Sequence, residues 1–398
     1  MLVLVYFNEP QPCYQESAIS EEDHKSSRKT SSLLRWHQKM KPGNLSQDLP
    51  TICKRNTTVA NISGFESFSP IVQDFLYYRP SSTTDWHRKR KSVNRSQDIP
   101  TRCEGNTTVA NISGFESFSP MIQDFLYYRH CRSFPMILDL PDKCGGDDEP
   151  EDVFLLLVIK SSPKNYERRE VLRKTWAEER SYKGKMIRRI FIIGTDGSGF
   201  EKERLNQLVM LEHQHYSDIL QWDFKDSFFN LTLKQILFLQ WMERRCPQAR
   251  FLLNGDDDVF AHTNNMVEYL QSLKDNDGSK HLFAGHLLPK SFPIRNKRNK
   301  YFVPLLVYEK DVYPPYCGGG GYLLSGYTAL VISKMSALIQ IIPIDDVYMG
   351  MCLAEMKLDP ESHMGVKTLG WYVPSKKVDT YHPCYMKEVL LIHMVCSL

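Results

Sequence analysis

From Glu151 onward, the chain alternates between apolar segments of strand length and longer segments with helical periodicity. Strands separated by helices in this way are typical of an α/β domain with a mainly parallel central sheet. The pattern predicts strands at 153–160, 188–195, 219–224 and 250–254, and helices at 165–180, 201–214 and 231–245. Such sheets bind ligands at the carboxyl ends of their strands, so polar residues that follow a strand are candidates for a functional site.

The segment FLLNGDDDVFAH places three consecutive aspartates at the end of one predicted strand. If the backbone stays extended there, Asp256 and Asp258 point to one side and Asp257 to the other. Two carboxylates on one side favour a divalent cation such as Mn²⁺ or Mg²⁺ that also binds phosphate oxygens. An acidic turn that caps the following helix explains the same residues without a metal, so both interpretations stay open.

The segment YPPYCGGGGYLLS contains four consecutive glycines, among them Gly318, Gly319 and Gly320. Without side chains, this backbone can approach a bulky ligand such as a sugar closely. A flexible loop is the alternative, and the prolines before the glycines and the apolar residues after them count against it. We therefore expect one wall of a ligand site here.

Two further segments place charged residues near predicted helix starts. In PIDDVYMGMCLAEM, Asp345 and Asp346 open a helix, where they serve either as helix caps or, for one of them, as a general base. In RREVLRKTW, Arg169 and Arg173 lie on one helical face near the end of the first strand. That face either binds a diphosphate or is simply solvated.

Other classes of protein lack support in the sequence. The chain contains no GxxxxGK[ST] or GxGxxG phosphate-binding loop and no GxSxG nucleophile motif. Its 50 basic and 47 acidic residues leave a net charge of only +3, which gives no reason to expect a nucleic-acid partner. We expect the basic run RNKRNK to be a solvated loop.

The N-terminal part of the chain lacks this alternation of strands and helices and contains a duplicated unit instead. Residues 44–79 recur at 94–129, and two copies are too few for a stacked repeat fold. We expect residues 1–114 to form a poorly structured stem and residues 115–150 to pack on the α/β domain. The residues predicted to form the packing face of a helix there are Phe115, Phe118, Met121, Ile122, Phe125 and Leu126. The acceptor sites for N-glycosylation are Asn44, Asn56, Asn61, Asn94, Asn106, Asn111 and Asn230.

The glycosylation sites and ten cysteines without a CxxC pair indicate folding in the oxidising secretory pathway. The N-terminal MLVLVYF, however, is too short for a membrane span or a signal peptide. Two explanations are open: the N-terminus is incomplete or misassigned, or the chain is cytosolic and its acceptor sites are unused.

Seven segments together resemble the β1,3-glycosyltransferases of glycosyltransferase family 31, specifically the β1,3-N-acetylglucosaminyltransferase branch. In the family's order they are FLLLVIKSS, RREVLRKTW, IFIIGT, DFKDSFFNLTLK, FLLNGDDDVF, YPPYCGGGGYLLS and IDDVYMGMCL. The resemblance covers about 131–393 and implies a GT-A fold, Rossmann-like, over residues 151–398. It also implies a Mn²⁺ cofactor, or Mg²⁺, and inverting transfer from a UDP-sugar.

The resemblance also assigns roles to individual residues. It implies that Asp258 binds the metal together with His393 of the LLIH segment, and that Asp346 is the catalytic base. We expect the nucleotide-sugar to contact Lys160, Ser161, Arg169, Arg173, Asp256, Asp257, Gly318, Gly319 and Gly320.

The function implied is transfer of N-acetylglucosamine from UDP-GlcNAc in β1,3 linkage to galactose of a glycoprotein or glycolipid glycan. Its setting would be the Golgi membrane, with the catalytic domain in the lumen and with self-association of the chain. The alternatives are a β1,3-galactosyltransferase and a non-catalytic, glycan-binding or chaperone-like paralogue. Three departures stand out: no anchor is visible, the stem unit is doubled, and the chain ends five residues after His393, where relatives continue. The last departure predicts weaker support for the strand that carries His393.

Overall fold

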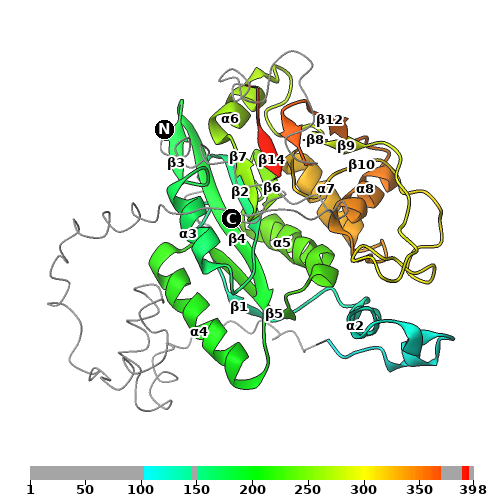
Figure 1. Ribbon diagram of the computed structural model, residues 1–398. Helices are drawn as coiled ribbons and strands as arrows, with labels where there is room; N and C mark the ends of the chain where they lie inside the picture. Colours follow the sequence, from blue (N-terminus) through cyan, green and yellow to red (C-terminus); the bar gives the residue numbers. More distant parts are fainter. Residues whose placement is uncertain (1–102, 146–150, 369–387, 394–398) are drawn as a thin grey trace, which may run out of the picture. The chain divides into compact units, whose positions relative to one another are not determined.

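The computed structural model describes residues 103–145, 151–368 and 388–393. They form an α/β fold around a mixed central sheet (Figure 1). The first copy of the duplicated unit, the start of the second copy and the acceptor sites Asn44, Asn56, Asn61 and Asn94 lie outside the described residues.

The central sheet has nine strands within the described residues. They are β1 (Met136–Leu138), β2 (Val153–Lys160), β3 (Arg180–Tyr182), β4 (Lys185–Thr195), β5 (Ile219–Lys225), β6 (Phe251–Asp256), β8 (Phe283–Gly285), β11 (Gly321–Ser325) and β12 (Glu361–Ser362). Their order is β1-β5-β4-β2-β6-β11-β8-β12, and β3 pairs with β4. The four strands from β5 to β6 run parallel, which confirms the predicted parallel centre. Antiparallel pairs of β1 with β5 and of β11 with β6 and β8 extend this centre on its two sides.

Helices cover both faces of the sheet (Figure 1). The α-helices are α2 (Pro120–Tyr128), α3 (Tyr166–Lys174), α4 (Gly199–Tyr216), α5 (Leu231–Arg245), α6 (Thr263–Ser272), α7 (Gly326–Ser336) and α8 (Asp345–Glu355), and the short 3₁₀ helices are η5 (Thr107–Asn111), η6 (Phe115–Ser117) and η7 (Phe228–Asn230). Strand β2 is buried along its whole length, and its side chains alternate between two apolar cores. One core includes side chains of α2, α5, α7 and α8, and the other includes side chains of α3, α4 and α6. None of the described helices has the length and apolarity needed to cross a lipid bilayer.

Two small sheets complete the architecture. They are formed by β7 (Val259–Ala261), β13 (Val366–Lys367) and β14 (Leu391–His393), and by β9 (Leu287–Leu288) with β10 (Tyr316–Cys317). Strand β14 lies between β13 and β7, with His393 opposite Val259. Leu391 of this strand is fully buried. Pairing on both sides therefore holds the strand that carries His393. One of its two neighbours, β7, is the strand that directly follows the aspartate motif in the sequence.

The predicted elements differ from the observed ones mainly at their ends. Helix α5 has the predicted bounds, whereas the helix predicted at 165–180 ends at Lys174. The chain then enters the β3–β4 hairpin, whose turn residues Lys183 and Gly184 both have positive φ. Such a two-residue turn matches the twist of a hairpin. The helix itself has already ended before Thr175, whose backbone is not helical.

The segment before residue 115 belongs to the compact part of the chain. Cys103 forms a disulfide with Cys131, and Val109 and Ile112 pack against the apolar core. The packed region therefore begins before the expected boundary between stem and packing segment.

Met121 is 55% exposed, contrary to its predicted place on the packing face. Phe115, Ile122, Phe125 and Leu126 are buried as predicted. A 3₁₀ helix and the extended residue Ser119 precede α2, so one continuous helical phase does not run through the whole segment.

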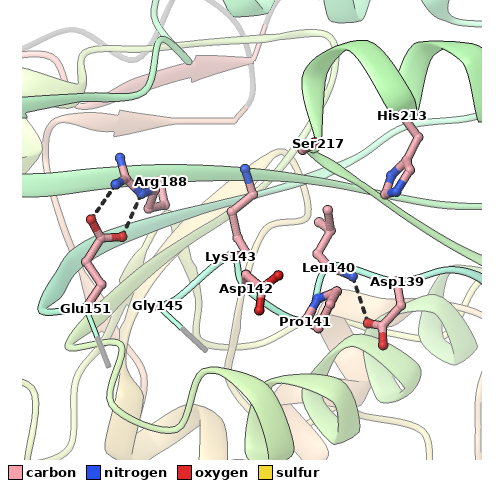
Figure 2. A pocket seen from close by; sticks show the side chains of 10 residues that line it. All are labelled: Asp139, Leu140, Pro141, Asp142, Lys143, Gly145, Glu151, Arg188, His213 and Ser217. Carbon is pink, nitrogen blue, oxygen red and sulfur yellow. Dashed lines mark hydrogen bonds and ion pairs between the residues drawn. The ribbon is translucent and has the colours of Figure 1, made fainter. Parts of the chain in front are cut away.

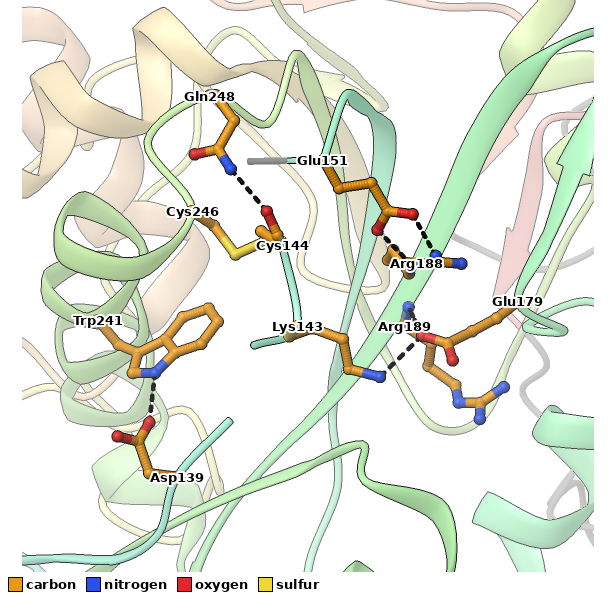
Figure 3. Close-up of a disulfide and its surroundings, with 10 residues drawn as sticks. All are labelled: Asp139, Lys143, Cys144, Glu151, Glu179, Arg188, Arg189, Trp241, Cys246 and Gln248. Atoms are coloured by element: carbon orange, nitrogen blue, oxygen red, sulfur yellow. Dashed lines mark hydrogen bonds and ion pairs between the residues drawn. A yellow bond between two sulfur atoms is a disulfide. The ribbon is translucent and has the colours of Figure 1, made fainter. Parts of the chain in front are cut away.

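A second disulfide joins Cys144, before β2, to Cys246, just after α5 (Figure 3). Beside it, Gln248 donates a side-chain hydrogen bond to the Cys144 carbonyl at 2.9 Å. The Trp241 indole donates to Asp139 at 2.8 Å. These contacts hold the segment before β2 against the core helix α5.

Candidate active site

The aspartate motif lies at the carboxyl end of β6, a central and fully apolar strand as far as Leu253. In the sheet, Lys160 at the end of β2 is the register partner of Asp256, and Gly321 of β11 is the partner of Gly255. The chain turns at Asp257 and Asp258 before β7 begins. The topology thus brings the aspartates, the last residue of β2 and the glycine segment to one edge of the sheet.

Each aspartate of the motif faces a different side chain, which is a lysine, an arginine or a histidine. Asp256 lies 2.9 Å from the Lys160 ammonium, and Asp257 lies 3.0 Å from the Arg168 guanidinium. Asp258 Oδ1 lies 3.5 Å from His393 Nε2. Lys160 and Arg168 therefore offset part of the repulsion between the three carboxylates.

Asp256, Asp258 and His393 form the candidate metal site. One ligand atom from each lies within 4.8 Å of the others. Asp258 Oδ1 is buried and has no hydrogen-bond partner, since its 3.5 Å approach to His393 is too long for a normal hydrogen bond. His393 Nδ1 lies 3.2 Å from the Thr368 carbonyl, an arrangement in which a histidine donates one ring N–H and presents the other nitrogen to a metal.

This donor set fits Mn²⁺ or Mg²⁺, because both cations accept carboxylate oxygens and Mn²⁺ also accepts imidazole. The neighbouring His393 ring lowers the pKa of Asp258, and that carboxylate raises the pKa of His393. The structure brings together Asp258 and His393, as the resemblance implies. It adds Asp256, which the resemblance places among the nucleotide-sugar contacts.

Asp257 connects the motif to the segment that follows β2. Its Oδ2 accepts hydrogen bonds from Ser161 Oγ at 2.6 Å and from Asn165 Nδ2 at 2.7 Å, and its Oδ1 pairs with Arg168. Neither Asn165 nor Arg168 is among the residues predicted from the sequence. Their position near the start of α3 could have identified them as candidates, since α3 follows β2 and begins at the sheet edge that carries the aspartate motif.

Arg169 and Arg173 are buried among carboxylates. Arg169 Nε and Nη2 donate to Glu212 at 2.7 and 2.6 Å, and Arg173 donates to Glu212 and Asp218. Arg169 also donates to Ser161 Oγ at 3.1 Å. This geometry gives the two arginines a positioning role behind Ser161, and contact of either one with a diphosphate stays a prediction.

Asp345 and Asp346 begin α8, as predicted, and their side chains point to different partners. Asp345 Oδ2 accepts a hydrogen bond from Lys160 at 2.7 Å. Asp346 Oδ1 accepts only from the backbone N–H of Val347, at 2.8 Å, while its Oδ2 faces Gly319. Burial, followed by repulsion from Asp345, raises the pKa of Asp346 to about 7. A carboxylate with this pKa is well suited to accept a proton near neutral pH.

The glycine segment lies between Asp346 and His393. A methyl group on Gly319 would lie 3.2 Å from Asp346 Oδ2, and one on Gly320 would lie 2.9 Å from His393 Cβ. At Gly318, it would lie 2.7 Å from the hydroxyl oxygen of Thr368. Close packing of the protein itself thus requires glycines here, in addition to the predicted access of a ligand. The same packing places the candidate base, Asp346, beside Gly319 and the candidate metal ligand His393 beside Gly320.

Three of the predicted acceptor sites for glycosylation, Asn106, Asn111 and Asn230, lie within the described residues. Asn106 and Asn111 are exposed in the η5 segment. Asn230 is half-buried at the start of α5, and its side chain donates to the Lys225 carbonyl at 2.8 Å.

A hollow of about 770 Å³ lies elsewhere, and no predicted site residue lines it (Figure 2). Among its charged residues, Lys143 pairs with Glu179 at 2.9 Å, and Arg188 pairs with Glu151. The hollow lies beside the segment before β2.

Comparisons with known proteins show which family this chain resembles. The model of the family described as Galactosyltransferase matches residues 167–364. A human N-acetyllactosaminide β-1,3-N-acetylglucosaminyltransferase 3 is 52% identical over 265 residues, which are 66% of this chain and 69% of that protein. A human acetylgalactosaminyl-O-glycosyl-glycoprotein β-1,3-N-acetylglucosaminyltransferase is 48% identical over 66% of this chain and 68% of its own length. A rat UDP-GlcNAc:betaGal β-1,3-N-acetylglucosaminyltransferase 7 is 43% identical over 66% of this chain and 65% of its own length.

The fold and the site thus define an enzyme of the UDP-sugar-dependent hexosyltransferase class. The chain belongs to the galactosyltransferase family, glycosyltransferase family 31, and its described relatives are β1,3-N-acetylglucosaminyltransferases.

Proposed function

We propose that the protein transfers N-acetylglucosamine from UDP-GlcNAc to the 3-hydroxyl of a galactose on a glycoprotein or glycolipid glycan, with β linkage. The observation that carries the proposal is the placement of Asp346 and His393 on either side of Gly319 and Gly320. An acceptor hydroxyl beside Asp346 would face a donor held on the side of Asp258 and His393. The printed activities of the relatives support the choice of sugar and linkage.

The chemistry is a single displacement at the anomeric carbon. Asp346 accepts the proton of the acceptor hydroxyl as its oxygen forms the new bond to that carbon. The bond from the carbon to the diphosphate oxygen breaks on the opposite face, and UDP leaves with the electron pair. Attack on an α-linked donor in this way gives a β product without a covalent enzyme intermediate.

Mn²⁺ is the cofactor that we propose, held by Asp258 and His393 with Asp256 beside them. When bound, it supplies positive charge that stabilises the diphosphate of the leaving group. Asp257 and Ser161 fix the turn that carries these ligands, and Lys160 supplies a further fixed positive charge at the same sheet edge.

We also propose that the protein works in the Golgi lumen at the membrane, through an anchor outside the described residues. The disulfides Cys103–Cys131 and Cys144–Cys246 and the exposed acceptor sites Asn106 and Asn111 support this route. A loss of apparent mass after glycosidase treatment of the protein from cells would agree with it. An unmodified chain in the cytosol would contradict it.

The proposal is tested by measuring UDP release from the full chain with Mn²⁺, a lactose-type acceptor and either UDP-GlcNAc or UDP-galactose. We expect release with UDP-GlcNAc and a product whose new linkage is β1,3 by NMR. Release with UDP-galactose alone would indicate the related galactosyltransferase activity instead. No release with either donor would contradict the enzymatic proposal.

A further inference from the structure

Lys160 lies buried between carboxylates of two different elements. Its ammonium is 2.9 Å from Asp256 of β6 and 2.7 Å from Asp345 of α8. It also lies 3.4 Å from the Gly319 carbonyl. Only 4% of the Lys160 residue surface is exposed, so this cation depends on these partners for its stabilisation.

Asp345 is free to make this contact because it does not cap its own helix. The N-cap residue of α8 is Ile344, whose side chain makes no cap, and the first-turn N–H of Val347 donates to Asp346 rather than to Asp345. Asp345 is itself buried, with 5% of its surface exposed, and its Oδ2 points to Lys160. Lys160 is thus held by one carboxylate from β6 and one from α8.

Asp345 and Asp346, at the start of α8, thus have different contacts. Asp345 attaches the helix to the end of β2, while Asp346 points to Gly319 with only one backbone donor. A helix start held at one residue fixes the direction of the side chain that follows it. The same ammonium also contacts Asp256, so one side chain connects the aspartate motif to the helix of the candidate base.

We propose that Lys160 and Asp345 are positioning residues whose buried ion pair holds Asp346 toward the acceptor side while Lys160 fixes Asp256 on the donor side. The role of Asp346 as base rests on the proposed function. The proposal gives Lys160 a task other than contact with the nucleotide, which the family resemblance implied. It predicts that loss of Asp345 impairs the transfer step rather than donor binding.

The test compares Asp345→Asn, Lys160→Met and the double variant of the full chain, each with Mn²⁺ and UDP-GlcNAc. We expect Asp345→Asn to lower kcat by about 100-fold, the loss that a misplacement of about 1 Å causes. UDP affinity and donor KM should stay within about twofold of the wild type, since the contact of Asp345 is with Lys160 and not with the aspartate motif itself. Measurements at pH 8.5, above the pKa of Asp346, separate misplacement from altered ionisation.

The double variant should be no slower than the slower single variant, because both substitutions break the same contact. Lys160→Arg keeps the charge and should recover part of kcat. Lys183→Met is the matched control, since Lys183 pairs with Glu268 at 2.6 Å on the surface. It should leave kcat unchanged.

Hydrogen exchange of the peptide 344–350 gives a readout that does not depend on activity. Exchange there should rise in Asp345→Asn and in Lys160→Met, and it should stay unchanged in Lys183→Met. Unchanged exchange in both variants, or losses of kcat that multiply in the double variant, would overturn the inference. If the wild type transfers no sugar, the proposed function fails, and the exchange measurement still decides whether the ion pair holds α8. If Lys160→Met does not fold, Asp345→Asn and Lys160→Arg provide the same comparison.

Discussion

The carboxylates at the sheet edge differ in how completely the protein satisfies them. Asp257 has three side-chain donors, and Asp345 has the buried Lys160 ammonium. Asp258 has an oxygen without a partner, and Asp346 has a single backbone donor. Groups that the folded chain leaves incompletely satisfied are the ones available to a ligand or a proton. This difference separates Asp258 and Asp346 from the carboxylates that hold the site together.

Replacement of Asp346 by Asn should lower kcat by about 100- to 10,000-fold, because the amide cannot accept the proton of the acceptor hydroxyl. UDP affinity in the presence of Mn²⁺ should stay near that of the wild type. Initial rates of UDP release and calorimetric titration measure the two quantities. Asp311→Asn, at an exposed position, is the control and should keep full activity. A variant Asp346→Asn that keeps most of its rate would remove this residue from the mechanism.

The rate of transfer should rise with pH around neutrality. Burial and repulsion from Asp345 raise the pKa of Asp346 to about 7, and only the ionised carboxylate accepts a proton. At pH 6, about a tenth of the molecules would carry the active form, so kcat/KM should be about tenfold below its plateau. A pH series from 5.5 to 8.5 with saturating Mn²⁺ measures this. A flat profile over that range would contradict the assignment.

Replacement of Asp258 by Asn should weaken Mn²⁺ binding by at least about 100-fold, the upper end of the losses caused by changing only the partners of metal ligands. Titration of the protein with Mn²⁺, followed by electron paramagnetic resonance, gives the affinity without any turnover. Asp275→Asn is the control, because Asp275 is exposed. Equal affinities of the two variants would exclude Asp258 as a ligand.

At the scale of elements, the sequence predicts the buried strands well, because a strand that is buried on both faces of the sheet appears as an uninterrupted run of apolar residues. The bounds of β2 and α5 follow from the sequence alone. The end of α3 at Lys174 does not, since the helix predicted from the sequence continues to residue 180, whereas the backbone at Thr175 is no longer helical. The exposure of Met121, in the first turn of α2, also escapes prediction.

The glycine segment is an element whose packing can be tested directly. Replacement of Gly320 by Ala would place a methyl group 2.9 Å from His393 Cβ, so β14 must shift and Mn²⁺ binding should weaken by about tenfold. Gly255→Ala is the matched control on the neighbouring strand, where the nearest atom lies 3.4 Å from the added carbon. Titration with Mn²⁺ distinguishes the two. The explanation is wrong if Gly320→Ala binds the metal as the wild type does.

At the scale of the whole molecule, the aspartates and the glycines are recognisable from their place after strands, but their partners are not. His393 lies far from Asp258 in the sequence, so the residue pattern alone does not identify it as a ligand and only the family resemblance does. The pairing of β14 with β7 brings the two residues together. Glu212 gave no signal at all, since its contact with Arg169 exists only when α4 packs beside α3. Long-range contacts of this kind depend on topology, which local periodicity does not encode.

The disulfides are a property of the whole chain, and their contributions to stability should differ. Cys144–Cys246 closes a separation of 102 residues and Cys103–Cys131 one of 28. Loop-closure entropy alone assigns about 4.7 and about 3.6 kcal/mol to them. Cys144 and Cys246 are also fully buried in the apolar core beside α5, so their loss removes packing as well.

We therefore expect Cys144→Ala/Cys246→Ala to lower Tm more than Cys103→Ala/Cys131→Ala, as measured by thermal unfolding of the two double variants. The first pair of substitutions should loosen the attachment of the segment before β2 to α5, and hence the strand that ends in Lys160. The second should act mainly on the η5 segment and leave Mn²⁺ binding near that of the wild type. The reverse order of Tm values would show that the packing of η5 and α2, rather than the attachment of β2 to α5, limits the stability of the domain.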